Sequence, residues 1–337
     1  MQRFIACILF GLFSCSNSGS SSSSTDVADS AQDGANSSDV QSSPTNDAGT
    51  VVTGDSTVVA DSVQRFGPPA QNLMVTLDVD GLARRYRLYV PTTQPGSPLP
   101  LIVIAHGGGN SEIPFIDEEG FRLLSENEGV ILAYPLGYVL GNNEGEWQLN
   151  TSDSNRHDIN FVEAIIDDIG SRYPVDASRV YAVGYSLGGM FVYELACQLS
   201  HRFAAIASHA GTMPVAPADC NPAVHSAIMH FHGDSDSIIP YSSPWDWKAW
   251  DSVGTMQDIP SLVAYWRTKY ACQDEAQSPS DVSVHSIYSG CEQGVRVEHH
   301  QLLNADHDWP TGVNGVRTSQ VIWLFLRDFT RDVAATP

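Results

Sequence analysis

Positive charge is scarce in this chain. Its 337 residues include 17 lysines and arginines against 39 aspartates and glutamates, so the formal net charge is −22 at pH 7. Phosphate backbones and anionic lipid surfaces attract basic patches and repel a protein surface of the opposite sign. The composition therefore predicts no nucleic-acid partner, and it argues against adsorption to a membrane through surface charge.

The N-terminal hydrophobic run is too short to cross a bilayer. The apolar stretch covers residues 4–13, whereas a membrane-spanning helix needs about 20 residues. A short apolar stretch behind Arg3 is typical of an export signal. It ends in Leu12-Phe-Ser-Cys15, which resembles the lipobox of bacterial lipoproteins. We expect residues 1–15 to be a lipoprotein-type signal peptide ending at a lipidated Cys15; ordinary secretion, with Cys15 incidental, is the alternative.

Apolar side chains are also scarce in residues 16–67, where serine, aspartate, asparagine and threonine dominate and residues 20–24 are all serine. Such a segment buries too little apolar surface to offset the entropy of ordering it. We expect a disordered Ser/Asp-rich linker over 16–67 and one folded domain over 68–332. We therefore expect the protein to be exported and to be held at the cell surface or outer membrane by the lipid on Cys15. Without that lipid we expect it to be secreted.

Cysteine is infrequent, and no two of the six cysteines have Cys-x-x-Cys spacing. Without that spacing a metal site built on cysteine is not supported, and we predict no metal and no cofactor. Export permits disulfides instead. The four cysteines beyond the linker allow three pairings. We prefer Cys197 with Cys220 and Cys272 with Cys291, because each pair closes one local loop.

What the folded part does contain is an alternation of strand and helix patterns. Apolar and polar residues alternate over 73–79 and 84–90 around Asp80-Gly81, which predicts an antiparallel hairpin. Continuous apolar runs and helically spaced apolar stripes predict the remaining elements. The predicted strands are 101–105, 130–134, 179–183, 203–208, 227–232 and a pair near 282–303, and the predicted helices are 158–173, 190–199, 259–270 and 315–329. This order indicates an α/β fold, with a mostly parallel sheet flanked by helices on both faces and an N-terminal antiparallel hairpin.

The most informative stretch is Val183-Gly-Tyr-Ser-Leu-Gly-Gly189, between a predicted strand and a predicted helix. Glycines two residues before and two after a serine allow a turn sharp enough to hold its hydroxyl above the sheet. The same turn places the backbone N–H of Leu187 beside the hydroxyl, at the positive end of the following helix. Ser186 is therefore a candidate nucleophile and Leu187 a candidate oxyanion donor. Any tight loop could supply these glycines, so the interpretation needs partner residues elsewhere.

Candidate partners for Ser186 follow later strands. The loop after 227–232 contains Asp234 and Asp236, either of which could instead cap its own turn. His307 lies in the loop before the last predicted helix, and among the 11 histidines it stands out by position. Serine, then aspartate, then histidine is the chain order of α/β-hydrolases. In such a triad the imidazole takes the serine proton and the carboxylate orients the imidazole.

A second oxyanion donor is expected from His106-Gly107-Gly108-Gly109, which follows the strand at 101–105. Backbone without side chains can approach a substrate closely, so Gly107 and Gly108 are the candidates; a simple tight turn is the alternative. Tryptophans can line a pocket for an aromatic acid or a sugar, although packing accounts for many of them. The pocket candidates are Trp147, Trp245, Trp247, Trp250 and Trp309.

Taken together, these stretches resemble the secreted polyhydroxybutyrate depolymerase and feruloyl esterase family of α/β-hydrolases, over about residues 70–330. The resemblance implies that Asp236, not Asp234, is the triad acid, and that Cys272 and Cys291 form a bridge. One departure is Gly108-Gly109, where the family often has a cysteine. The matching stretches are Tyr89-Val-Pro91, Pro100-Leu-Ile-Val-Ile-Ala-His-Gly107, Arg179-Val-Tyr-Ala-Val-Gly-Tyr-Ser-Leu-Gly-Gly-Met190, His232-Gly-Asp-Ser-Asp-Ser-Ile-Ile-Pro-Tyr241 and His307-Asp-Trp-Pro310.

The resemblance implies that residues 68–332 are the catalytic domain of a serine esterase that forms an acyl-enzyme on Ser186. The implied substrates are feruloyl or acetyl esters of plant polysaccharide, with a short 3-hydroxybutyrate polyester as the alternative. A serine peptidase would use the same triad, but the sequence contains no recognisable propeller-like or amine-anchoring domain. A non-catalytic binding protein on this scaffold would lose a triad member, and none is missing. The expected partner is an ester substrate, and a membrane only through Cys15.

Overall fold

A ten-stranded sheet organises the part of the chain that the computed structural model describes, which is residues 72–92, 97–108, 117–140, 143–151, 156–246 and 253–332. The expected signal peptide, Cys15 and the linker lie outside the described residues. The strand order is β1-β2-β4-β3-β7-β8-β9-β14-β13-β12. The strands are β1 (Leu73–Val79), β2 (Leu82–Tyr89), β3 (Leu99–Ala105), β4 (Ile131–Pro135), β7 (Val175–Tyr185), β8 (Ala205–His209), β9 (Ala227–Gly233), β12 (Asp274–Pro279), β13 (Ser283–Ser289) and β14 (Val297–Leu302).

The middle of the sheet is parallel, and both of its ends are antiparallel. β4, β3, β7, β8, β9 and β14 pair in parallel, while the β1–β2 hairpin lies at one end and β13 with β12 at the other. The hairpin turn residues Asp80 and Gly81 both have positive φ, the conformation that an Asp-Gly turn favours. The predicted α/β fold with a mostly parallel sheet and an N-terminal hairpin is confirmed.

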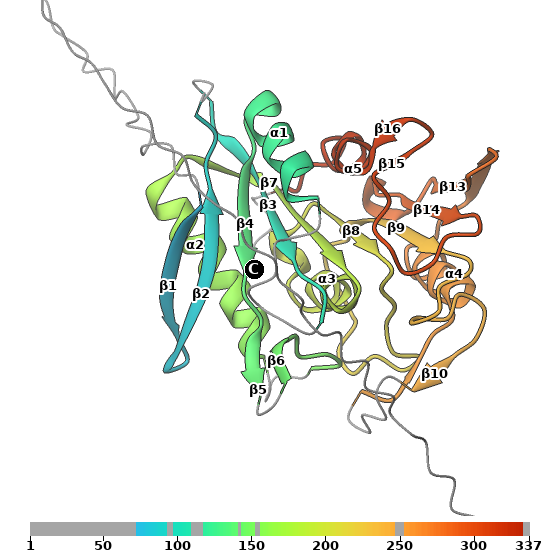
Figure 1. Cartoon of the computed structure of the whole chain (residues 1–337), viewed down its shortest axis with the longest axis horizontal. Helices are drawn as coiled ribbons and strands as arrows, with labels where there is room; N and C mark the ends of the chain where they lie inside the picture. Colours follow the sequence, from blue (N-terminus) through green and yellow to red (C-terminus); the bar gives the residue numbers. More distant parts are fainter. Residues whose placement is uncertain are drawn as a thin grey trace, which may run out of the picture. The chain divides into compact units, whose positions relative to one another are not determined.

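Helices cover both faces of this sheet (Figure 1). α1 (Glu118–Glu128) and α5 (Thr318–Leu326) pack against each other, and α2 (His157–Arg172) packs against α3 (Leu187–Gln198). α4 (Ile259–Lys269) lies beside α3, because Trp266 stacks on Tyr193. None of the helices among the described residues combines the length and apolar character needed to cross a bilayer.

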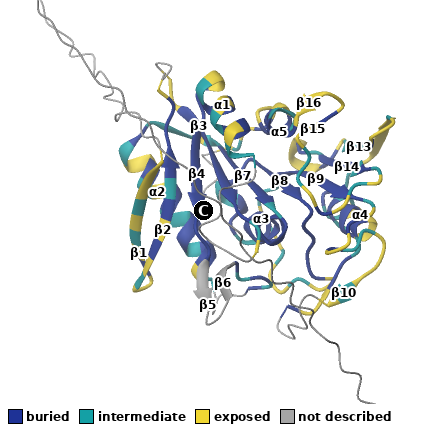
Figure 2. Cartoon of the chain, viewed as in Figure 1, coloured by how far each residue is buried: buried dark blue, intermediate teal, exposed yellow. Residues whose placement is uncertain are grey.

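The central strands are buried on both faces, which explains their unbroken apolar runs. Every residue of β3, β4, β8 and β9 is buried, and these strands are dark blue in Figure 2. On α2 the predicted apolar stripe faces inward. All of its members are buried: Ile159, Val162, Ile165, Ile166 and Ile169.

Several elements differ from the sequence prediction, among them α1, β12 and α5. α1 was not predicted, because its glutamates hide a narrow apolar stripe that buries Phe121 and Leu124. β12 was not predicted either, since all of its residues are exposed and it has no apolar face. α5 begins at Thr318 instead of 315, because Gly315 has φ 78° in the turn between two short strands. These short strands are β15 (Gly312–Val313) and β16 (Val316–Arg317); the other short elements are β5 (Tyr138–Leu140), β6 (Asn143–Glu146), β10 (Trp245–Asp246), β11 (Thr255–Met256) and the 3₁₀ turns Ser200–Arg202 and Glu292–Gly294.

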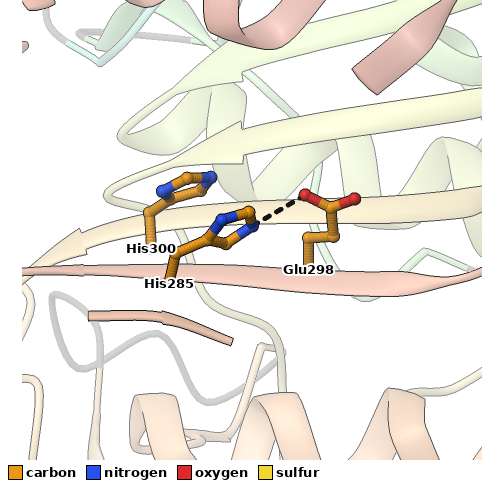
Figure 3. A group of neighbouring side chains, drawn as sticks. All are labelled: His285, Glu298 and His300. Atoms are coloured by element: carbon orange, nitrogen blue, oxygen red, sulfur yellow. Dashed lines mark hydrogen bonds and ion pairs between the residues drawn. The ribbon is translucent and has the colours of Figure 1, made fainter. Parts of the chain in front are cut away.

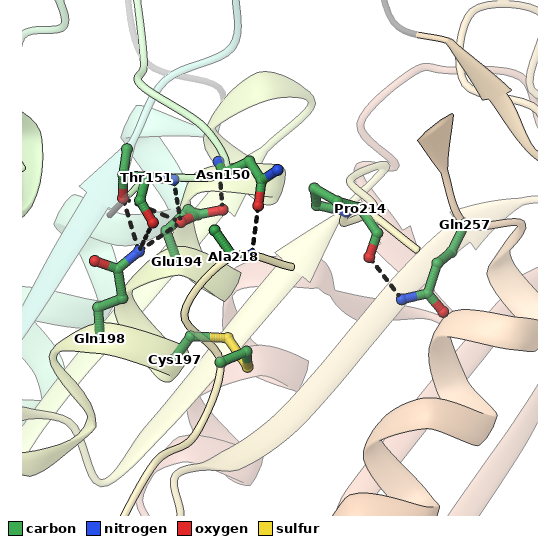
Figure 4. The surroundings of a disulfide bond; sticks show 9 residues. Asn150, Thr151, Glu194, Cys197, Gln198, Pro214, Ala218 and Gln257 are labelled. Carbon is green, nitrogen blue, oxygen red and sulfur yellow. Dashed lines mark hydrogen bonds between the residues drawn. A yellow bond between two sulfur atoms is a disulfide. The ribbon is translucent and has the colours of Figure 1, made fainter. Parts of the chain in front are cut away.

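Two disulfides join the expected pairs, Cys197 with Cys220 and Cys272 with Cys291. Near the first bridge a buried carboxylate, Glu194 of α3, accepts hydrogen bonds from the Asn150 amide at 2.8 Å and from Gln198 at 2.9 Å (Figure 4). The side-chain oxygen of Asn150 in turn accepts from the amide of Ala218 at 2.6 Å. Two loops, one before α2 and one after β8, are thereby held against α3.

We expect the second bridge to contribute about 3 kcal/mol to the free energy of unfolding. Its cysteines are separated by 19 residues, and a closed loop of this size restricts the unfolded chain by about that amount in the chain-entropy model. Urea unfolding of wild type and of a variant carrying Cys272→Ser with Cys291→Ser measures the difference. Peptide mapping without reductant is the control, and a fragment linking Cys197 to Cys272 or Cys291 would contradict the pairing.

Candidate active site

Ser186 occupies a strained turn between β7 and α3. Its backbone has φ 54° and ψ −120°, a region that residues with a side chain rarely adopt. The flanking glycines allow the backbone segments to approach each other. A Cβ added to Gly184 would lie 2.0 Å from the carbonyl oxygen of Gly188, and one added to Gly188 would lie 2.3 Å from that of Ala105. Both positions therefore require glycine, as the Gly-x-Ser-x-Gly pattern predicts.

The structure brings Ser186, His307 and Asp236 into one hydrogen-bonded chain. His307 Nδ1 lies 2.8 Å from Asp236 Oδ2, and His307 Nε2 lies 2.9 Å from Ser186 Oγ. An ionised carboxylate only accepts hydrogen bonds, so Nδ1 carries the proton and Nε2 is free to accept from the serine hydroxyl. Ser186 and His307 are 8% and 9% exposed, so the arrangement lies just beneath the surface.

Asp234, the rival acid, points elsewhere. Its Oδ1 accepts a hydrogen bond from the amide of Asn304 at 2.8 Å, and its Oδ2 lies 3.3 Å from the side-chain nitrogen of Gln301. These contacts fasten the end of β9 to the end of β14. Asp234 therefore stabilises its turn, which is the role that the sequence allowed for either aspartate.

The carboxylate of Asp236 is held in its ionised form. Burial raises its pKa, but hydrogen bonds from His232, from His307 and from the Ile239 amide outweigh burial, so the pKa lies well below its usual range. Its Oδ1 accepts from the amides of Ile238 at 2.8 Å and Ile239 at 2.7 Å. With one oxygen held by backbone and the other facing His307, the carboxylate has a fixed orientation.

The lowered pKa of Asp236 predicts a pH-dependent contribution to stability. Because the folded-state pKa lies below the unfolded value of about 3.9, the stabilisation is fully present above that pH and is lost as the pH falls below it. We expect the difference in free energy of unfolding between wild type and Asp236→Asn to be constant at mildly acidic pH and to shrink below about pH 4. Urea titrations across this range measure it, and a difference that stays constant to the lowest pH would contradict the prediction.

Behind Asp236 a directed chain of hydrogen bonds extends into the core. Nε2 of His232 lies 3.2 Å from Asp236 Oδ2 and 2.9 Å from the carbonyl oxygen of Ile239. Both partners are acceptors, so Nε2 carries the proton, and in the neutral ring Nδ1 must accept. It lies 3.2 Å from Nε2 of His230, whose Nδ1 lies 2.8 Å from the Tyr193 hydroxyl. Each donor in this chain therefore points toward Asp236.

The buried ring of His230 is held in its neutral form. His230 is fully buried, and its burial together with the neighbouring histidines His232, His299 and His209 holds its pKa well below the usual value. A neutral His230 can accept from Tyr193 and donate to His232 at the same time. His232 was not predicted as a site residue, although the spacing His232-x-x-x-Asp236 is contained in the motif that indicated Asp236.

Two further residues that the sequence analysis missed hold the His307 loop in place. The hydroxyl of Tyr185 donates to the carbonyl oxygen of His307 at 2.8 Å. Oδ1 of Asp306 accepts from the amides of Ser237, at 2.7 Å, and His307, at 2.8 Å. Tyr185 and Asp306 directly precede Ser186 and His307, so adjacency to the triad candidates is the only sequence signal for them.

The glycines expected to supply an oxyanion donor lie against the serine turn. A Cβ added to Gly107 would lie 3.4 Å from Cβ of Ser186, and one added to Gly108 would lie 3.5 Å from the side chain of Leu187. Leu187 is the first residue of α3, and the Ser186 side chain does not cap that helix. The backbone of these residues therefore borders the space above Ser186. Gly109 lies outside the described residues.

Trp147 does not line an open pocket, which corrects the sequence-based expectation. Its side chain is 1% exposed, its ring stacks on Phe191 at 4.6 Å, and its Nε1 donates to the carbonyl oxygen of His106 at 2.8 Å. Nε2 of His106 accepts from the amide of Gly137 at 2.9 Å. Trp147 thus supports the strand end that leads into Gly107.

Trp309 is the pocket candidate that lies nearest the triad. It is partly buried and contacts the rings of Tyr185, at 6.1 Å, and His209, at 4.9 Å. Trp245 is partly buried at the start of β10, and Trp247 and Trp250 lie outside the described residues. The described tryptophans among the pocket candidates therefore do not form one cluster. Of these, only Trp309 contacts Tyr185, whose ring in turn contacts His307.

A solved enzyme shares the fold of this chain. The solved acetyl xylan esterase from Aspergillus awamori superposes with a TM-score of 0.58 at 14% sequence identity, covering 76% of this chain and 99% of that one. A family model described as Phospholipase/Carboxylesterase matches residues 143–246, which contain Ser186 and Asp236. The described part of the chain has the α/β-hydrolase fold.

Its sequence relatives are esterases. NocK of Nocardia uniformis subsp. tsuyamanensis, which carries an esterase name, is 27% identical over 77% of this chain. The bifunctional acetylxylan esterase/xylanase XynS20E of Neocallimastix patriciarum is 25% identical over 75% of it, and feruloyl esterase B of Piromyces equi is 25% identical over 60%. The match spans 82% of NocK but 34% and 37% of the other two. These relatives confirm the resemblance to feruloyl esterases, and the chain is an enzyme of the esterase type.

Proposed function

We propose that this protein is an exported serine esterase that hydrolyses feruloyl or acetyl esters of plant polysaccharide. The observation that carries the proposal is the hydrogen-bonded chain from Ser186 through His307 to Asp236, at 2.9 and 2.8 Å. In this role Ser186 attacks the ester carbon while His307 takes the hydroxyl proton and then gives it to the leaving alcohol. Water repeats the attack on the acyl-enzyme and restores Ser186.

The negative charge that develops on the ester oxygen needs hydrogen-bond donors. The backbone N–H of Leu187 is the first candidate, since it belongs to the uncapped first turn of α3 and has the positive end of the helix behind it. Gly107 and Gly108 are the candidates for the second donor, because they border Ser186 and Leu187. Two donors fixed before the reaction stabilise the tetrahedral intermediate without reorganisation.

The substrate class rests on the relatives and on the ring beside the triad. Two of the relatives are named for acetylxylan and feruloyl ester hydrolysis. The ring of Trp309 contacts Tyr185, and Tyr185 contacts His307. Trp309 thus offers an aromatic surface near His307 that suits a ferulic acid ring or a sugar. The net charge of −22 disfavours anionic partners, which agrees with a neutral polysaccharide ester.

The experiment that tests this function is hydrolysis of a small substrate panel by the purified full chain. We expect kcat/KM for methyl ferulate or acetylated xylan to exceed that for hydroxybutyrate oligomers by at least about tenfold, and no cleavage of a peptide anilide. The same panel with Ser186→Ala is the control for contaminating esterases. A preference for hydroxybutyrate oligomers would replace the substrate class, and cleavage of the anilide alone would overturn the ester assignment.

Export and anchoring are part of the proposal. Two disulfides suit an oxidising compartment, and the Leu12-Phe-Ser-Cys15 ending suits lipidation. Acyl chains on Cys15 would hold the enzyme on a membrane, since two or more chains give stable anchoring. We expect Cys15→Ala to release the protein from the membrane fraction or to block processing. If the variant sediments with membranes as the wild type does, the anchor is not Cys15.

A further inference from the structure

Three side chains of metal-binding type gather on β13 and β14, apart from the Ser186 site (Figure 3). His285 of β13 lies directly opposite His300 of β14 in the strand ladder. Glu298 lies two residues before His300 and therefore on the same face of the sheet. One ligand atom from each residue lies within 4.8 Å of those from the other two. No other group of three such residues occurs in the described part of the chain.

His300 is the unusual member of this group. It is 4% exposed, yet neither of its ring nitrogens has a hydrogen-bond partner. Phe231 stacks on its ring at 4.5 Å, and His285 stacks at 3.8 Å with an angle of 13° between the rings. Stacking covers the faces of an imidazole, whereas its nitrogens bond in the plane of the ring, so stacking does not satisfy them. Buried polar atoms in native proteins almost always have a partner, which indicates that something absent from the chain itself bonds to His300.

Glu298 is oriented toward the same place. Its Oε2 accepts a hydrogen bond from Nε2 of His285 at 2.8 Å, while its Oε1 is held by Nε of Arg296. Arg296 is itself fixed by Asp328 at 2.9 Å. Carboxylates that bind metals are commonly oriented by such an outer hydrogen bond to the second oxygen. Arg296 therefore leaves one oxygen of Glu298 facing the two imidazoles.

The group borders an open groove between the sheet and α5. The cavity has a volume of about 520 Å³ and is lined by these three residues together with apolar side chains that include Met229, Val321 and Leu324. His285, whose side chain is 24% exposed, lies at its rim. An ion can therefore enter from solvent and keep a water molecule as a further ligand.

We propose that His285, Glu298 and His300 bind a divalent transition-metal ion of the zinc type, with water in the fourth position. Two imidazoles and one carboxylate form the donor set that zinc takes in open tetrahedral sites, at about 2.0–2.2 Å. The two parallel rings present their edges side by side, and a rotation of the more exposed His285 brings the donors together. The ion replaces the His285–Glu298 hydrogen bond, gives His300 its missing partner and ties β13 to β14. The role is structural and independent of ester hydrolysis.

This site revises the expectation of no metal. That expectation considered cysteine spacing, and the ligands proposed here are histidines and a glutamate from two strands. His285 and Glu298 are 13 residues apart, and only the antiparallel pairing of β13 with β14 brings them together on one face of the sheet. No local motif in the sequence reports such a cross-strand group.

The test is zinc binding by untagged, chelator-treated full chain, measured by calorimetry and by the rise in melting temperature. We expect one zinc ion per chain and a higher Tm, since a ligand that binds only the folded state stabilises it. His300→Phe keeps the ring stack and removes the nitrogens. It should weaken binding by more than about 100-fold, because loss of an outer-sphere partner alone costs about 10- to 100-fold. Mg²⁺ should not compete, since a hard ion prefers oxygen ligands.

His201→Gln is the matched control, because His201 is partly exposed and lies beside a glutamate, Glu163, outside the group; its zinc affinity should equal that of wild type. Copper(II) bound in place of zinc should show two nitrogen ligands by electron paramagnetic resonance, and one nitrogen ligand in His285→Ala. This readout does not depend on comparing stabilities. Absence of binding, or binding that is as tight in His300→Phe as in wild type, would overturn the proposal. If zinc abolishes ester hydrolysis with equal potency in wild type and in His300→Phe, the ion binds at His307 instead, and the proposal is overturned as well.

Discussion

Replacing Ser186 with alanine is expected to lower kcat for ester hydrolysis by a factor on the order of 10⁴ to 10⁶. The variant keeps the strained turn and the neighbouring donors but loses the oxygen that lies 2.9 Å from His307 Nε2. No other hydroxyl is hydrogen-bonded to the imidazole ring of His307 among the described residues, so no side chain there can replace it. Steady-state kinetics on methyl ferulate or a small acetyl ester measure the loss.

His307→Ala should cost a similar factor, and the double variant should be little worse than either single one. Residues that act as one unit are not additive, because the first deletion already removes the shared step. Circular dichroism should show that both variants remain folded. An Ser186→Ala enzyme that keeps even a tenth of its activity after repurification would mean that another residue is the nucleophile. Additive losses would mean that Ser186 and His307 act in separate steps.

The second large effect distinguishes two neighbouring aspartates. Asp236→Asn should lower kcat on the order of 10⁴, because an amide facing Nδ1 favours the wrong tautomer of the imidazole. Asp234→Asn should leave kcat near that of wild type and cost about 1 kcal/mol of stability, the usual effect of losing a side-chain cap on a backbone amide. The structural reason is that Asp236 lies 2.8 Å from His307 Nδ1, whereas Asp234 bonds to Asn304.

Each aspartate variant serves as the control for the other, because both lie in one loop and both replace a carboxylate by an amide. Activity and urea unfolding should be measured on the same preparations, so that a loss of kcat is not mistaken for a loss of folded protein. A crippled Asp234→Asn beside a nearly normal Asp236→Asn would move the acid to the other position. Mild effects in both would mean that the triad acid does not come from this loop.

Local features of the chain were readable from the sequence. The Asp80-Gly81 hairpin, the apolar stripe of α2 and the turn at Ser186 each depend on residues a few positions apart, whose conformational preferences act locally. Glycine at 184 and 188 was readable for the same reason, since the crowding that requires it arises within one turn and the adjoining strand. The disulfide partners are separated by 23 and 19 residues. Each bridge closes a local loop, so the pairing could be predicted from the sequence as well.

Polar and short elements were not readable. β12 is exposed along its whole length, so it lacks the alternation of apolar and polar residues by which an edge strand is recognised. Its position comes from pairing with β13, which is a tertiary contact. The predicted start of the last helix was too early because an apolar pattern does not report the turn at Gly315.

The sequence by itself determined the α/β fold, the serine turn and the order of the candidate triad. Only the tertiary structure decided which groups meet. Ser186 and His307 are 121 residues apart, and Asp236 and His307 are 71 apart, so sheet order and loop path set their distances. Packing of the sheet also set the contact of Trp147 with His106 and the chain of hydrogen bonds from Tyr193 to His232. The same holds for His285 and His300, which meet across a strand pair. Sequence patterns report periodicity over a few residues, whereas contacts between distant residues arise from packing of the whole sheet, and that packing brings the candidate catalytic residues together.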